Sequence, residues 1–407
     1  MERDILITGG GLIGSTLALG LAQAGFKVTM LDALPKGTRR KKGFDGRSYA
    51  MALATTKMLR TLGLWETLAP NAQPMNAIKV SDGRAGQAPS PFFMHFDHAE
   101  IGTEPMGYMI EDRHARIALL EAEAAEPNFE HIPEARVVSQ MVEPGRATVT
   151  LEDGRELSAP LLIGCDGRAS GTAERAGIKR MGWAYGQTAL VCALHVEKPH
   201  EGVAHQLFLP EGPLAILPLT ENRVGVVWTE SEANAAGITG LDDEGYLEVL
   251  RPRFGDFLGD ISLAGERFTY PLGLSLAQSF AADRVALVGD AAHGIHPIAG
   301  QGLNAGMRDV AALVEVLSEA RQRGEDIGVA LVLGRYQQWR RFDTATLALA
   351  TDTFNRLFSN DIAPVRTLRD LGMGVVNALP GLRRTFIREA AGLTGDLPRL
   401  LQGRPLP

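Results

Sequence analysis

Three glycine-rich segments hold residue types whose spacing could do chemistry. The first is Gly9-Gly10-Gly11-Leu12-Ile13-Gly14, a G-x-G-x-x-G pattern between an apolar run and a helical stretch. In such a pattern Gly9 permits a tight turn, Gly11 admits a pyrophosphate against the backbone, and Gly14 lets helix and strand pack closely. The free N–H groups at the start of the following helix attract phosphate oxygens. The segment predicts a dinucleotide site, but it does not separate NAD from FAD.

An acidic side chain follows at the distance that such a site requires. Asp32 ends the second apolar run, 18 residues after Gly14. A carboxylate placed there can accept hydrogen bonds from both hydroxyls of an adenosine ribose, and it would repel a 2′-phosphate. The pattern therefore disfavours NADP at this position. The alternative is a glycine-rich turn in an unrelated α/β protein.

The other two segments also place polar groups after buried strands. Asp166-Gly167 follows the apolar run Leu161–Gly164, although Asp-Gly is also a common turn. Gly289-Asp290 ends a further strand, and Gly300-Gln301-Gly302 precedes a helix that begins near Leu303. A helix N-terminus aimed at a ring can stabilise negative charge that develops on it. His293 and His296 do not predict a metal site, because neither a carboxylate nor a third histidine stands at ligand spacing.

The elements that must position these residues are of several types. Residues 4–32 read as a βαβ unit, residues 48–64 and 110–123 as helices, and residues 136–164 as strands with a turn at Asp153-Gly154. Alternating strands over 186–230 predict an antiparallel sheet, and the chain is largely helical after Leu303. We predict an α/β fold with a Rossmann-like domain (1–75, 101–179 and 273–344). An antiparallel substrate domain (76–100 and 180–272) and a C-terminal helical segment (345–407) complete it.

Composition excludes several classes of protein. The chain has 407 residues, 45% hydrophobic and 22% charged, with a net charge of −7, which excludes disorder and gives no basic field for a nucleic acid. Only two cysteines are present, which favours a reducing compartment such as the cytoplasm. Residues 5–26 lack charge, but six of them are glycine, so we interpret this run as strand, loop and helix rather than a membrane span.

The order of the three segments resembles the group A flavoprotein monooxygenases, the para-hydroxybenzoate hydroxylase superfamily. The likeness spans roughly residues 4–345. Within it, the stretch 296–304 (HPIAGQGLN) followed by Arg308-Asp309 is similar to the ubiquinone-biosynthesis hydroxylase family. Residues 45–50 (DGRSYA) before 62–65 (LGLW), and residues 356–360 (RLFSN), also resemble that family.

The resemblance implies roles for the matching positions. The FAD pyrophosphate would be lined by Gly9, Gly11, Leu12, Ile13 and Gly14, and Asp32 would bind the adenosine ribose. Arg47 and Arg113 would lie near the flavin or the diphosphate. Asp166 and Gly167 would serve FAD and the passing NAD(P)H, and Gly289-Asp290 would hold the ribityl or diphosphate part. The isoalloxazine would be lined by Pro297, Gly300, Gln301, Gly302, Leu303 and Asn304.

The implied reaction is aromatic hydroxylation of a polyprenyl phenol in ubiquinone synthesis. NAD(P)H would reduce the flavin, O₂ would add at C4a, and the hydroperoxide would deliver oxygen to the ring, while the protein supplies position and excludes water. Two departures stand out. Asp32 replaces a frequent glutamate with little consequence, whereas Ala173 replaces a frequent arginine and puts the NAD(P)H side in question. No side chain is identified as the catalytic base.

Several alternatives stay open at this point. A small soluble aromatic compound could be the substrate, or the chain could be a flavin enzyme without oxygen transfer or a non-catalytic prenyl-binding protein. No Trp-x-Trp-x-Ile-Pro run supports a halogenase. An apolar tunnel for the prenyl chain, or an ordinary sheet core, would be formed by Phe208, Leu209, Leu214, Ile216 and Trp228. The arginine-bearing C-terminal segment would contact the inner membrane peripherally, bind partner proteins of a biosynthetic assembly, or simply cap the first domain.

Overall fold

The computed structural model describes residues 3–35, 37–87, 90, 93–295, 300–358 and 363–406, with the side chains of 354–356, 363–368 and 370 left out. Its first layer is a six-stranded sheet in the order β19-β20-β12-β1-β2-β8. All neighbours are parallel except β19 and β20. The strands are β1 (Ile5–Thr8), β2 (Val28–Leu31), β8 (Phe129–Ile132), β12 (Leu161–Gly164), β19 (Ala281–Ala282) and β20 (Val285–Leu287).

This sheet is buried on both faces, as its continuous apolar runs predict. Ile5 and Ile7 face a core shared with α1 (Leu12–Gln23), α4 (Asp112–Ala125) and α8 (Gln301–Gln322). Leu6 faces the opposite core, shared with a small antiparallel sheet. That sheet consists of β9 (Val137–Glu143), β10 (Arg146–Leu151) and β11 (Glu156–Ala159), and the short helix α5 (Gly171–Arg175) follows β12. The parallel strands therefore end together at one edge, where the three glycine segments begin.

A three-stranded sheet lies above the helices, and it corrects one prediction. Residues 48–64 were expected to be one helix, but β3 (Ser48–Ala52) comes first and only then α2 (Leu53–Thr61) and the short α3 (Trp65–Leu68). β3 pairs with β7 (Gly107–Glu111), which also pairs with β4 (Ala72–Met75). Pairing with β7, distant in sequence, overrides the local helical pattern of 48–52.

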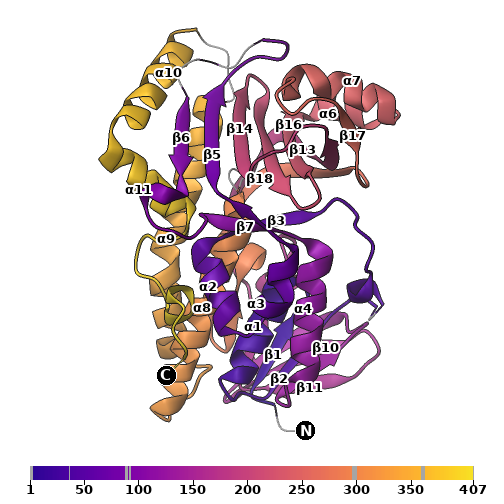
Figure 1. The fold of residues 1–407 in the computed structure, drawn as a ribbon. Helices are drawn as coiled ribbons and strands as arrows, with labels where there is room; N and C mark the ends of the chain where they lie inside the picture. The colour runs from indigo at the N-terminus through magenta and orange to yellow at the C-terminus, as the bar shows by residue number, and fades with distance from the viewer. Residues whose placement is uncertain are drawn as a thin grey trace.

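The upper part of the molecule is a large sheet in the order β21-β18-β13-β16-β15-β14-β5-β6, with β17 beside β13 (Figure 1). Only the β14–β5 pair is parallel. The helices α6 (Glu232–Thr239) and α7 (Asp243–Phe254) share a core with one face of the sheet. Its strands are β5 (Ala77–Asp82), β6 (Met94–Asp97), β13 (Arg180–Val196), β14 (Val203–Leu209), β15 (Gly212–Leu219), β16 (Arg223–Ser231), β17 (Ile261–Leu263), β18 (Phe268–Ala277) and β21 (His293–Gly294).

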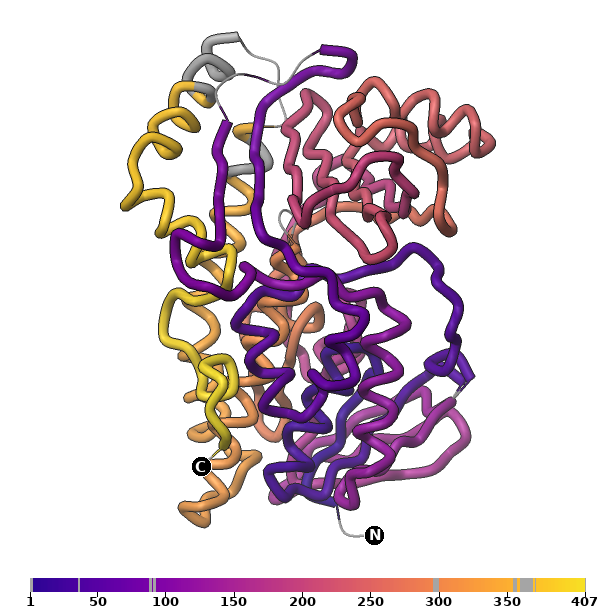
Figure 2. The backbone as a smooth tube through the Cα atoms, in the orientation of Figure 1, coloured from indigo at the N-terminus to yellow at the C-terminus, as the bar shows by residue number. Residues whose placement is uncertain are grey.

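Three helices follow α8 and connect the two parts. α9 (Ala330–Phe358) runs from beside α8 up to the large sheet. α10 (Ala363–Ala378) and α11 (Pro380–Ala390) pack on the face of this sheet that is opposite to α6 and α7 (Figure 1). The tail then returns along α8, where Leu400 and Leu401 join the first core (Figure 2). α9 continues unbroken through the predicted boundary at residue 344. No helix in the described part of the chain is long and apolar enough to cross a membrane. The mixed α/β fold class is confirmed.

Candidate functional site

The first glycine turn leaves open space where a pyrophosphate is expected. A Cβ on Gly9, which has φ +101°, would lie 2.4 Å from the carbonyl oxygen of Cys165, and one on Gly14 would lie 2.0 Å from the oxygen of Gly9. These two glycines are therefore required by packing. Gly11, by contrast, would meet nothing within 4 Å. It caps α1, whose first turn has free N–H groups and no acidic side chain. The turn fits an anionic group placed over Gly11.

Asp32 lies beside this turn at the end of β2. It is buried, and its Oδ1 accepts a hydrogen bond of 3.0 Å from the backbone N–H of Leu34. A Cβ on Gly10 would lie 2.3 Å from Oδ2, so the carboxylate lies directly against the glycine loop. This places a fixed negative group next to the helix N-terminus, where a ribose would adjoin a pyrophosphate.

The second segment uses its aspartate within the protein. Both oxygens of Asp166 accept hydrogen bonds, from the Ser170 hydroxyl (2.5 Å) and from the backbone N–H and hydroxyl of Thr172 (2.9 Å each). Thr172 also bonds Thr8 of β1 at 2.8 Å, which joins the first and second segments. Gly167 has φ +80° and open space around it. Asp166 thus orders the start of α5, and its role toward FAD or NAD(P)H stays a prediction.

The third segment packs on the first through an isoleucine. A Cβ on Gly289 would lie 3.2 Å, and one on Gly306 2.8 Å, from the side chain of Ile13. The side chain of Ile13 therefore fixes two glycine segments relative to each other. Asp290 is partly exposed and pairs with Arg168 at 3.3 Å. Arg180 holds the same turn by donating to the carbonyl oxygens of residues 290 and 291.

The start of α8 is the second helix N-terminus at this site. Gly300 caps it with φ +65°, and a Cβ there would lie 2.9 Å from that of Ala50. Both polar atoms of the Asn304 side chain are hydrogen-bonded within the protein. Its Oδ1 accepts from Ala52 N and Thr55 Oγ1, and its Nδ2 donates to the carbonyl oxygens of Ala50 and Gly300. Asn304 thus ties β3 to α8, which presents the backbone of residues 301–303. Pro297 lies outside the described residues.

The two predicted arginines lie near the connection before β3. Arg47 pairs with Asp45 at 2.6 Å and Asp112 at 3.4 Å. The hydrogen bond to Asp45 is the largest of the effects that raise the pKa of Arg47, so the guanidinium stays charged. Arg113 pairs with Glu111 at 2.7 Å. Both keep their charges compensated by the protein, and their contact with a cofactor stays a prediction.

A buried charged cluster, absent from the predicted site list, supports the Gly289 turn. Asp309 of α8 is fully buried. It accepts hydrogen bonds from the N–H of Gly289 (3.0 Å), from His293 Nε2 (2.5 Å) and from Arg340 Nε (2.8 Å). Burial alone would raise the pKa of Asp309, but His293 and Arg340 outweigh it and hold that pKa below its usual value. The available sequence signal was the pair of charged residues Arg308 and Asp309 within the otherwise largely apolar stretch 303–314.

A mostly apolar cavity of about 590 Å³ extends from the start of α8 toward α11. Ala50, Asn304 and Ala305 line it beside the first turn of α8. Of the five predicted tunnel residues only Phe208 lines it, because Leu209, Leu214, Ile216 and Trp228 point into the core against α6 and α7. Successive strand residues face opposite sides, so the prediction mixed the two faces. Most of the apolar lining was missed and includes Met75, Val80, Phe96, Met106 and Leu217.

Comparison with known proteins gives this geometry a family. Residues 2–341 match a family model described as an FAD binding domain. "Ubiquinone hydroxylase UbiL" of Rhodospirillum rubrum is 43% identical over 406 residues, with 99% of this chain and 93% of that protein covered. The chain belongs to the ubiquinone-biosynthesis hydroxylase family. It is an FAD-dependent monooxygenase, as predicted.

Two further comparisons agree with this family. "3-demethoxyubiquinol 3-hydroxylase" of Escherichia coli is 33% identical, with 96% of this chain and 98% of that protein covered. The solved structure of "p-nitrophenol 4-monooxygenase PnpA" from Pseudomonas putida superposes with a TM-score of 0.80. It covers 97% of this chain and 99% of that one at 20% identity. This structural likeness supports only the fold of this hydroxylase.

Proposed function

We propose that this hydroxylase adds oxygen to the aromatic ring of a polyprenyl phenol during ubiquinone synthesis, using FAD, NAD(P)H and O₂. The observation that carries the proposal is the cavity of about 590 Å³, whose lining includes residues of the first turn of α8. Mostly apolar pockets of this size suit a ring with an apolar substituent. The names of the relatives, which include ubiquinone hydroxylases, support the same class of substrate.

The residues present fit FAD at the carboxyl edge of the parallel sheet. The open space at Gly11, the carboxylate of Asp32 and the N-terminus of α1 suit the adenosine diphosphate part. Gly289, Asp290 and the backbone N–H groups of residues 301–303 suit the ribityl chain and the ring. When bound, FAD would supply the oxygen chemistry, and the N-terminus of α8 would stabilise negative charge that develops near it.

The chain's own part in the reaction is to orient the phenol and exclude water. The apolar lining from β4, β5, β6 and β14 removes water from the ring carbon that receives oxygen. Gln206 is buried against the cavity, and its amide donates to the carbonyl oxygen of Leu214 at 3.4 Å. That leaves its carbonyl oxygen to accept a hydrogen bond from a phenolic O–H.

The remaining predictions concern partners. We propose transient NAD(P)H contact near Asp166, Gly167 and Arg168, without a dedicated second domain. We also propose that the enzyme works in the cytoplasm at the inner membrane, contacting the membrane or partner proteins of a ubiquinone-synthesis assembly through its C-terminal segment. Charged and exposed apolar side chains on α11 support this last part.

The test uses complementation together with a cavity variant. Strains lacking each ring-hydroxylation step of ubiquinone synthesis would express the wild type, Ala204→Phe or the control Ala236→Phe, with quinone measured by mass spectrometry. Ala204 lines the cavity, whereas Ala236 is exposed on α6. We expect rescue of at least one strain by the wild type and the control, and loss of rescue with Ala204→Phe. If the wild type rescues no strain but turns over a soluble phenol, the substrate belongs to the class of small soluble phenols.

A further inference from the structure

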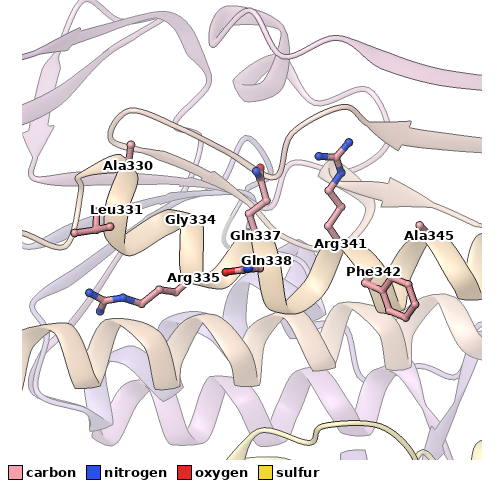
Figure 3. A pocket seen from close by; sticks show the side chains of 9 residues that line it. All are labelled: Ala330, Leu331, Gly334, Arg335, Gln337, Gln338, Arg341, Phe342 and Ala345. Carbon is pink, nitrogen blue, oxygen red and sulfur yellow. The ribbon is translucent and has the colours of Figure 1, made fainter.

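The apolar cavity opens to the surface between α9 and α11. Most of its lining residues are buried or half-buried, but Phe342 and Thr346 of α9 and Phe386 and Glu389 of α11 line it and are exposed. Phe342 is 77% exposed, and it also borders a surface hollow on the outer side of α9 (Figure 3). Phe386 stacks on Phe96 of β6 with ring centroids 6.2 Å apart. These four residues mark the mouth of the cavity.

Exposed apolar side chains continue outward from this mouth. We call five of them the mouth face: Leu349, Leu371, Val375, Leu379 and Leu382, each between 45% and 68% exposed. Leu371 and Val375 are spaced by four residues and lie along one side of α10, and Leu379 and Leu382 follow at the turn into α11 and in its first turn. Exposed apolar side chains gathered on neighbouring helices in this way mark a candidate interaction site.

Two exposed arginines of α11 lie close to the mouth residues Phe386 and Glu389 in the sequence. Arg384 and Arg388 are exposed and form no ion pair within the described residues. Nearby arginines that serve the fold are paired: Arg383 bonds Glu100 at 2.7 Å, and Arg369 bonds Asp82 at 2.5 Å. Glu389, the carboxylate at the mouth, accepts a hydrogen bond from the Thr394 hydroxyl. The uncompensated arginines therefore complement an anionic surface.

The size of the cavity requires an exit for a long substrate. About 590 Å³ corresponds to a drug-sized ligand, which here means the ring and the first isoprenoid units. The rest of a polyprenyl chain has to leave through the mouth between α9 and α11. In water that chain would expose its whole apolar length, which is unfavourable for every CH₂ group.

We propose that the mouth face docks on an anionic lipid surface, so that the polyprenyl chain of the substrate stays in the bilayer while its ring reaches the cavity. The inference rests on the proposed function for the identity of the substrate. Apolar residues flanked by arginines suit binding in the plane of a membrane interface. The arginines would contact anionic headgroups, and the cavity would open toward the acyl chains.

Vesicle co-sedimentation of the FAD-loaded enzyme tests the surface directly. The probes are vesicles of phosphatidylcholine alone and vesicles that also contain about 30 mol% phosphatidylglycerol, which gives a negative surface potential. We expect binding to the anionic vesicles, weakened by salt. Each arginine near such a surface contributes roughly fivefold, so the double variant Arg384→Gln, Arg388→Gln should bind about 30-fold more weakly. Leu379→Ser with Leu382→Ser should also weaken binding, at least tenfold for two side chains withdrawn from lipid.

Matched controls come from other faces of the molecule. Arg251→Gln on α7 removes an exposed charge, and Val138→Ser with Met141→Ser on β9 removes two exposed apolar side chains. Both controls should bind vesicles as the wild type does. The inference is overturned if the wild type does not bind anionic vesicles, or if the controls lose binding as much as the mouth-face variants. It is also overturned if the enzyme is an oligomer that Leu379→Ser with Leu382→Ser dissociates, since that face would then be a self-interface.

An activity comparison separates this inference from the proposed function. A phenol with a single prenyl unit, in buffer, should be hydroxylated equally by the wild type and the mouth-face variants. A long-chain phenol in vesicles should be hydroxylated more slowly by the variants. Failure to hydroxylate either phenol, with vesicle binding intact, contradicts the proposed function and leaves the docking surface supported. Equal rates on the long-chain phenol overturn the docking surface alone.

Discussion

Replacing Gly11 by alanine separates the space cleared for a cofactor from the space needed for folding. Gly11 has φ −71° and ψ −178°, which an alanine adopts without strain. Its Cβ would meet no protein atom within 4 Å. We therefore expect the free energy of unfolding of the apoprotein to change by less than about 0.5 kcal/mol.

The same methyl group would stand where the pyrophosphate of FAD approaches the N-terminus of α1. Overpacking by one methyl group costs about 1–3 kcal/mol, which corresponds to roughly a 5- to 150-fold rise in the Kd for FAD. Titration of the apoprotein with FAD, followed by quenching of flavin fluorescence, measures this change. Thermal unfolding of the apoprotein measures the other half of the prediction.

Gly14→Ala is the matched comparison on the same helix. Its Cβ would lie 2.0 Å from the carbonyl oxygen of Gly9, so the backbone itself must shift. We expect this variant to destabilise the apoprotein by about 2 kcal/mol or more, before any cofactor is added. The reasoning is refuted if Gly11→Ala binds FAD like the wild type, or if its apoprotein is as unstable as that of Gly14→Ala.

Three other changes test the buried charges. Asp309→Asn removes the buried negative charge that Arg340 and His293 contact and should lower the free energy of unfolding by about 3–5 kcal/mol at pH 7. Because the fold lowers the pKa of Asp309, this advantage of the wild type should hold above pH 4 and disappear at lower pH in denaturation series. Burial lowers the pKa of His205 to about 4, so the wild type should lose about 3 kcal/mol as pH falls from 6.5 to 4. His205→Gln should not show that loss, and identical pH profiles would contradict the assignment. Arg369→Met removes the guanidinium that bonds Asp82. Limited proteolysis within residues 363–390 should then accelerate at least tenfold, which corresponds to about 1.4 kcal/mol of local stability. The control Arg251→Met should be cleaved at the rate of the wild type.

The glycine turns could be predicted from sequence because their reasons are local. Gly9, Gly11 and Gly14 follow from the short connection between a buried strand and a helix, and the structure places them there. The cavity wall could not be predicted in the same way. Phe208 and Leu209 are adjacent, apolar and in one strand, yet they face opposite sides, and only the pairing of β14 with β5 decides which side is the cavity.

The strand β3 and the Asp309 cluster were missed for a related reason. Residues 48–52 have a helical pattern, and their strand exists because β7 supplies the hydrogen bonds from more than 50 residues away. Asp309 gains its partners from His293 and Arg340, which lie on separate elements. Long-range partners of this kind leave almost no trace in the spacing of a single sequence.

The continuous course of α9 has a consequence for how this enzyme can diversify. Arg340 bonds the Asp309 cluster, while Phe342 and Thr346 border the cavity mouth, all within two turns of one rigid helix. A substitution on α9 that reshapes the mouth therefore also disturbs the support of the Gly289 turn. β5, β6 and β14 line the same cavity without touching that cluster. Changes of specificity, natural or engineered, should therefore accumulate on these strands while α9 stays fixed.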